Sequence, residues 1–302
     1  MVNGIIRMQV LGTIARENRP HVPWDDSGAR PLAPSPVKPF SAWSLLSAAS
    51  LILGAVPARA QSNFEIQVYG SALVPVRATM FELHSNYTAQ GSTTESNGML
   101  PTNHALHETV EITHGFNEWF ECGFYLFLSQ RQPEGLNYVG NHIRPRFSVP
   151  ERYHLPVGLS LSQEIGYQTT EYSEDTWTWE IRPIIDQQLG RFYWSLNPTV
   201  EKSLRGANAA ERFEFAPNAQ VNLDVSKKVN VALEYYASFG TFGAFPAIEH
   251  TEQQLMPAVN LDFGADWEFS AGVGIGMTTP TDHLIAKVIF GRRVGGHRAP
   301  PR

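Results

Sequence analysis

Residues 211–240 read ERFEFAPNAQVNLDVSKKVNVALEYYASFG, and apolar and polar positions alternate along both halves of this stretch. Every second position from Phe213 to Leu223 is apolar, and the pattern resumes from Val229 to Phe239 after a polar turn at 226–228. A period of two is that of a β-strand with one face in an apolar and the other in a polar environment. The stretch therefore predicts a β-hairpin.

The same alternation recurs about twelve times between residues 77 and 293. The predicted strands cover residues 77–89, 105–115, 118–130, 138–149, 155–170, 175–187, 190–202, 211–224, 229–240, 252–263, 267–278 and 282–293. A soluble hairpin shows this pattern once, whereas a dozen such segments are typical of a closed transmembrane β-barrel. The expected fold is all-β, a single antiparallel transmembrane β-barrel of about 12 strands.

The connections between these segments are of two kinds. Those near residues 115–117, 150–154, 188–190, 226–228 and 264–266 are short, and most others are longer, above all 90–104 and 241–251. Outer-membrane barrels have short periplasmic turns and long outer loops. Tryptophans lie beside both kinds of connection, as two interfacial girdles require: Trp119, Trp194 and Trp267 near short turns, Trp177 and Trp179 after a longer loop.

Prolines within the predicted strands are the strongest evidence against a barrel. Proline has no N–H to donate to a sheet and is normally confined to edges and bulges. We therefore expect these prolines on the outward face or near bends that help the sheet to curve and close. They are Pro145, Pro183, Pro198, Pro217 and Pro257.

Composition narrows the class of protein. The 302 residues carry a formal net charge of −6 and one cysteine, Cys122. An acidic chain lacks the basic character of a nucleic-acid-binding protein, and a lone cysteine forms no intrachain disulfide. Outside one N-terminal stretch, no apolar run approaches the roughly 18 residues that a membrane-spanning helix needs.

That N-terminal stretch predicts a secretory signal peptide. Lys38 precedes an apolar core at 42–56, and Ala58-Arg59-Ala60 supplies the small-residue pattern of a cleavage site. Residues 1–60 are thus expected to be an N-terminal extension plus signal peptide, cleaved after Ala60, with translation hypothesised to begin near Val37. Residues 61–302 are expected to be one outer-membrane β-barrel domain.

Three segments carry a resemblance to known proteins: RPRFSVPE at 144–151, WEIRPIID at 179–186 and EYYASFG at 234–240. With them the chain resembles a family of poorly characterised bacterial outer-membrane β-barrel proteins, over almost the whole mature region. The resemblance implies the fold and the outer-membrane location, and it transfers no catalytic residue. The expected partners of such a barrel are outer-membrane lipid and, during insertion, the barrel-assembly machinery; no cofactor is expected.

The alternation places charged residues of both signs on the inward face of the barrel, where a polar interior tolerates them. Arg144, Arg146 and Arg182 are predicted to form a cationic stripe opposite acidic neighbours, whose field would orient small polar or anionic solutes. The alternative is a salt-bridged network that closes the lumen. The predicted pore-lining residues are Arg144, Arg146, Arg182, Glu164, Glu180, Asp186, Glu234 and Lys287.

The sequence predicts a narrow channel for passive diffusion of small solutes and leaves two alternatives open. An outer-membrane hydrolase would need a serine with an orienting histidine, yet no Gly-x-Ser-x-Gly motif is present, so no enzyme is expected. His104 and His107 are the only close histidine pair, and no metal site is expected because nothing nearby repeats ligand spacing. A structural or adhesive barrel would act through outer loops 90–104 and 241–251.

Overall fold

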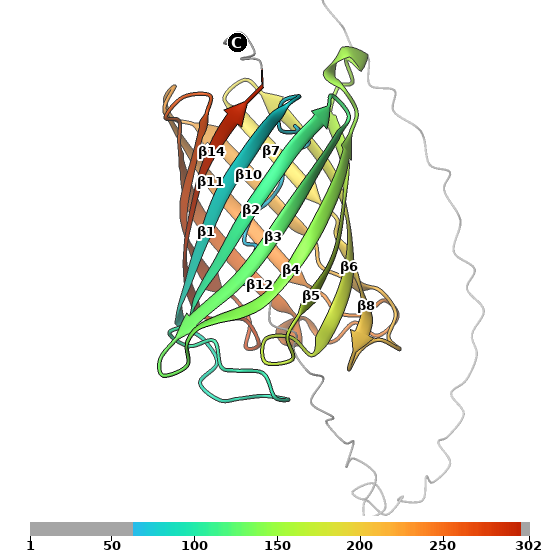
Figure 1. Ribbon diagram of the computed structural model, residues 1–302, viewed down its shortest axis with the longest axis vertical. Helices are drawn as coiled ribbons and strands as arrows, with labels where there is room; N and C mark the ends of the chain where they lie inside the picture. The colour runs from blue at the N-terminus through green and yellow to red at the C-terminus, as the bar shows by residue number, and fades with distance from the viewer. Residues whose placement is uncertain (1–62, 297–302) are drawn as a thin grey trace, which may run out of the picture. The chain divides into compact units, whose positions relative to one another are not determined.

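The computed structural model describes residues 63–296, which form one closed antiparallel sheet (Figure 1). No helix among these residues is long and apolar enough to cross a membrane. The strand segments are β1 (Ala78–Gln90), β2 (Leu106–Asn117), β3 (Phe120–Arg131), β4 (Gly135–Ser148), β5 (Gly158–Gln168), β6 (Asp175–Leu189), β7 (Phe192–Asn197), β8 (Val200–Gly206), β9 (Glu214–Phe215), β10 (Asn218–Asp224), β11 (Val229–Ser238), β12 (Glu252–Leu261), β13 (Trp267–Gly276) and β14 (Leu284–Gly295).

The fourteen segments make twelve barrel strands, because two strands are interrupted. β7 and β8 continue one another along β6 in a single register, and β9 and β10 continue one another in the same way along β8 and β7. β1 pairs with β14, which closes the sheet and leaves no free edge. The predicted 12-strand antiparallel barrel is confirmed, with strand ends shifted by a few residues.

Side chains alternate between the two faces of the wall as the sequence predicts. In β1, Glu82, His84 and Asn86 are buried in the lumen, whereas Phe81 and Leu83 are exposed on the exterior. The same division holds around the barrel, whose large exposed side chains are mainly apolar and whose buried residues include many carboxylates and arginines. A polar inside and an apolar outside suit a wall that faces lipid.

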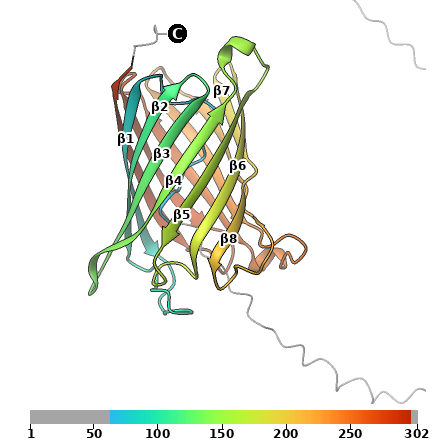
Figure 2. The same cartoon turned by 45° about the vertical axis from the view of Figure 1, so that its right-hand side comes forward.

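The two ends of the barrel differ (Figure 2). One end carries the tight turns β2–β3, β6–β7 and β10–β11, together with the β4–β5 connection and its short 3-10 helix Glu151–Tyr153. The other end carries the longer connections 91–105 and 239–251. The predicted loop at 131–137 is shorter than expected, because β3 and β4 extend to a tight turn at 132–134. An ion pair of 2.5 Å between Arg131 and Glu134 stabilises this turn. We call the ends periplasmic and outer respectively.

Aromatic residues gather at both ends of the exterior. Near the periplasmic turns Trp119 stacks on Phe147, with ring centroids 5.9 Å apart, and Trp267 lies 5.3 Å from Phe290. Toward the outer end Trp177 lies 5.7 Å from Tyr167. Aromatic rings at these heights lie where membrane barrels place their interfacial girdles.

Three of the five strand prolines form a row across neighbouring strands. The register of β6 with β7 and β8 sets Pro198 opposite Pro183, and that of β7 and β8 with β10 and β9 sets Pro217 opposite Pro198. Pro198 and Pro217 lie in the two breaks, where an N–H for the ladder is missing. Pro145 and Pro257 lie between lumen-facing neighbours and therefore point outward.

A charge on the outside of the wall tests its contact with lipid. Leu83 lies midway along β1 and is 43% exposed, so Leu83→Arg is expected to destabilise the barrel in lipid vesicles by about 2–4 kcal/mol. Urea unfolding in vesicles measures this cost. Val294→Arg is the matched control, because Val294 is also exposed but lies beside the periplasmic rim, where the cost falls to about 0–1 kcal/mol. Equal costs at the two positions would contradict a lipid-facing wall.

Candidate functional site: the occupied lumen

The chain before β1 runs through the inside of the barrel. We call residues 63–76 the luminal segment; it is drawn in blue within the barrel in Figure 1. At the outer end the Asn63 amide donates to Asp282 at 2.7 Å. At the periplasmic end the Val74 N–H donates to Glu121 at 2.6 Å, just before β1 begins. The segment therefore spans most of the lumen.

Side chains of the wall satisfy the backbone of the luminal segment in its outer half. The carbonyl oxygen of Phe64 accepts a hydrogen bond from Thr109 at 2.7 Å, and that of Val68 accepts one from Gln220 at 2.9 Å. Asn197 contacts Tyr69 twice, accepting from its N–H and donating to its carbonyl oxygen. Backbone groups removed from bulk water need such partners, so the wall holds the segment in an extended form.

The periplasmic half of the segment is bound by charged side chains. Asp186 accepts from the N–H of Ser71 at 2.9 Å and from its hydroxyl at 2.6 Å. Arg146 donates to the carbonyl oxygens of Gly70 at 3.0 Å and Ala72 at 2.6 Å. Hydrogen bonds to charged groups are about twice as strong as neutral ones. This half is therefore the more firmly anchored.

Apolar packing also fixes the segment. Ile66 and Val68 cluster with Tyr236, Met256 and Ile285, all of them buried. A second cluster holds Phe64 with Tyr125, Phe127 and Val139 from the opposite wall. Both clusters lie inside the barrel and both include residues of the luminal segment, so this segment supplies part of the core of the described chain.

The three predicted arginines meet around one ring. The guanidinium carbons of Arg144, Arg182 and Arg146 lie 4.5, 4.9 and 5.8 Å from the centre of the Tyr69 ring. The Tyr69 hydroxyl lies 3.2 Å from that of Tyr125. Cations are attracted to the face of an aromatic ring at these distances, so the arginines clamp the luminal segment at Tyr69.

Each predicted cation also has a carboxylate partner. The nitrogen–oxygen distances are 2.6 Å for Arg144–Glu111, 2.8 Å for Arg146–Glu121, 2.8 Å for Arg182–Glu180 and 2.5 Å for Lys287–Glu234. The geometry thus resembles the predicted salt-bridged network more than a stripe of free positive charge. The other two predicted residues face inward as well: Asp186 binds the luminal segment, and Glu164 contacts His142.

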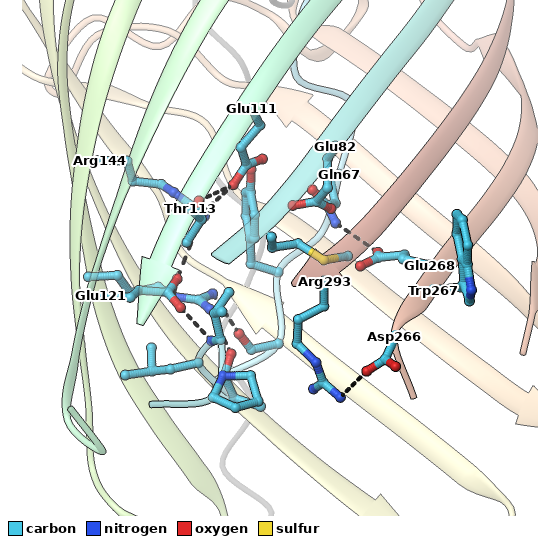
Figure 3. Close-up of a pocket in the computed structure, with 18 of the residues that line it drawn as sticks. Gln67, Glu82, Glu111, Thr113, Glu121, Arg144, Asp266, Trp267, Glu268 and Arg293 are labelled. Carbon is cyan, nitrogen blue, oxygen red and sulfur yellow. Dashed lines mark hydrogen bonds and ion pairs between the residues drawn. The ribbon is translucent and has the colours of Figure 1, made fainter. Parts of the chain in front are cut away.

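Two cavities lie on either side of the Tyr69 region. The periplasmic cavity, of about 360 Å³, is lined by Tyr69 and by residues such as Glu82, Glu111, Glu268 and Arg293 (Figure 3). The outer cavity, of about 320 Å³, is lined by residues 63–65 of the luminal segment and by side chains of the wall and outer loops. The lumen is therefore narrowest at the Tyr69 region and widens into a cavity toward each end.

Sequence reasoning did not find the luminal segment. Its signal is present, because Phe64, Ile66 and Val68 alternate with polar neighbours as in a strand. The pattern alone does not distinguish a wall strand from an extended segment inside the wall. The deciding fact is that lumen-facing side chains of the wall bind its backbone, and that emerges only from the fold.

Several solved structures are similar to this chain at low sequence identity. No protein-family model and no curated protein matches the chain. Among solved structures, a KdgM porin in complex with disordered oligogalacturonate is 8% identical, with 72% of this chain and 99% of that chain covered and a TM-score of 0.45. The NanC porin is 7% identical over 72% and 100%, with a TM-score of 0.46. Outer membrane protein Omp33 of Acinetobacter baumannii is 11% identical over 72% and 98%, with a TM-score of 0.40.

Proposed function

We propose that this protein is a narrow outer-membrane channel for passive diffusion of small polar solutes, restricted by its own luminal segment. The observation that carries the proposal is a closed wall, apolar outside and polar inside, with a cavity at each end of the lumen. A solute would enter one cavity, pass the Tyr69 constriction and leave by the other. Conductance of the pure protein in planar bilayers tests this, and a folded protein that never conducts removes the channel.

The charge of the outer cavity supports a preference for cations. Two arginines line it, Arg131 and Arg182. The carboxylates that line it are Glu65, Glu164, Glu174, Asp175, Glu180, Glu201, Glu214, Glu252 and Asp282. An excess of one sign in a confined space concentrates ions of the opposite sign. The prediction of anionic solutes depended on three arginines, and each of these has an acidic partner.

Reversal potentials measure this preference. In a KCl gradient the wild-type channel is expected to pass K⁺ more readily than Cl⁻, and Glu201→Gln with Glu214→Gln to reduce the ratio, because both side chains line the outer cavity. Glu118→Gln is the control, since Glu118 is half-exposed at the periplasmic rim. An anion-selective wild type would contradict the proposed sign.

Cleavage after Ala60 falls outside the described residues and is part of the same proposal. The luminal segment begins at Asn63 beside the outer cavity. Cleavage after Ala60 would leave two residues ahead of it, short enough to leave the cavity accessible. N-terminal sequencing of protein extracted from outer membranes is expected to start at Gln61; a longer mature chain would contradict it.

A further inference from the structure

Three carboxylates line up across four neighbouring strands beside the periplasmic cavity. Glu111 of β2 lies directly opposite Glu82 of β1, and Glu82 lies opposite Gly291 of β14, which in turn lies opposite Glu268 of β13. Gly291 leaves room for its neighbours, because a Cβ there would come within 2.9 Å of Glu82 Cγ. Like charges in direct cross-strand positions destabilise a sheet, so this row needs a compensating positive charge.

The basic side chains near this row already form ion pairs with other carboxylates or with one member of the row. Arg144 binds Glu111 through Oε1, and Lys287 binds Glu234. Glu82 has no cation within ion-pair distance among residues 63–296, although Glu111 and Glu268 lie beside it in the row. Glu82 therefore lacks a counter-charge of its own within the row.

The imidazole of His84 lies beside this row with both ring nitrogens free of hydrogen bonds. It is fully buried. Its Nε2 lies 3.4 Å from Oε2 of Glu111, an oxygen that also makes no hydrogen bond. Buried polar groups almost always have partners, and such an exception calls for a specific explanation.

We propose that Glu82, His84 and Glu111 form a binding site for a divalent transition-metal ion of the Zn²⁺ class, with Glu268 as the neighbouring carboxylate. One ligand atom from each of the three residues lies within 4.8 Å of the others. Tetrahedral Zn²⁺ with bonds of about 2.0–2.1 Å separates neighbouring ligand atoms by about 3.3–3.4 Å. The distance between His84 Nε2 and Glu111 Oε2 agrees with that separation.

The donor set determines the class of ion. An imidazole with carboxylates suits Zn²⁺ and related first-row metals, whereas Mg²⁺ and Ca²⁺ prefer oxygen ligands alone. The ion has a route to the site, because Glu82, Glu111 and Glu268 all line the periplasmic cavity, whose lining continues to Asp266 at the rim (Figure 3).

The site also touches the luminal segment. The amide of Gln67 donates to Glu268 at 3.4 Å, and the Gln67 oxygen is buried without a partner (Figure 3). A metal ion that orders Glu82 and Glu268 would thereby hold this part of the segment against β1 and β13.

The test is a metal count on the refolded, tag-free, full barrel. The protein is stripped with a chelator, incubated with Zn²⁺ alone, separated from free metal by gel filtration and analysed by mass spectrometry for zinc. His84→Ala is expected to lose one equivalent of Zn²⁺ relative to wild type. His107→Ala is the matched control, because His107 is also buried in the lumen without hydrogen bonds but belongs to no such cluster within residues 63–296.

Two further measurements test the site even if the His84→Ala variant folds poorly. Glu82→Gln is expected to lose the same equivalent, and calorimetry of wild type is expected to show binding of Zn²⁺ but no binding of Mg²⁺ at the same concentration. Zinc held at Glu65, His142 and Glu164, a second His/Glu group, would survive in His84→Ala. Equal zinc contents in wild type, His84→Ala and Glu82→Gln, or no zinc in wild type, would overturn the site.

Discussion

Removal of residues 63–73 raises the single-channel conductance of the barrel severalfold. The deletion joins Ser62 to Val74 and leaves every barrel strand intact. It takes out the Tyr69 ring, which three guanidinium groups surround at mid-height, together with the backbone that Arg146 and Asp186 bind. An interior of about twelve strands is wider than the side-chain-filled lumen of eight, so an emptied lumen is expected to conduct freely.

Planar-bilayer recordings measure this effect, and heat-modifiable gel migration shows that the variant still folds. The control deletes residues 242–247 of the β11–β12 connection, which line neither the periplasmic nor the outer cavity. Its conductance should stay near that of the wild type. If the luminal deletion folds and conducts no better than the full chain, the segment is not the constriction.

Lys287→Met is expected to cost about 3–5 kcal/mol of the free energy of unfolding. Lys287 is 1% exposed, and its ammonium group lies 2.5 Å from Glu234 Oε2, an oxygen that also accepts a hydrogen bond from Tyr236. Removal of the lysine leaves a buried carboxylate with only a neutral partner. Such a charge costs more than the ion pair itself contributes, because it has lost its solvation and keeps no counter-charge.

Urea unfolding in detergent or lipid measures the change. The double variant Glu234→Gln with Lys287→Met removes both charges and is expected to recover most of the loss. A single variant within about 1 kcal/mol of wild type would mean that water in the lumen solvates Glu234, as for an exposed ion pair.

The wall of this barrel was predictable from sequence because lipid and lumen impose opposite demands on neighbouring residues. Phe81 and Leu83 must be apolar where Glu82 and His84 are polar, and that contrast is visible residue by residue. Pro198 and Pro217 were expected on the outward face or near bends within continuous strands, whereas their interruption of two strands in line with Pro183 depends on cross-strand register. Alternation indicates which face a residue occupies but not its partner on the next strand.

The candidate sites show the same limit. That Arg144, Arg146 and Arg182 face inward followed from alternation, but their meeting at Tyr69 depends on a segment outside the predicted strands. Glu82, His84 and Glu111 come together because of the β1–β2 pairing. They have no metal-ligand spacing along the chain, which is why the sequence predicted no metal site.

The luminal segment constrains the order of assembly. Asn63 lies beside the outer loops and Val74 at the opposite rim, so the chain passes through its own barrel between them. Once β1 and β14 have paired, the wall has no lateral gap, so the segment is either in place before closure or enters along the barrel axis. A short epitope attached immediately ahead of Asn63 is expected to lie at the outer end of the barrel.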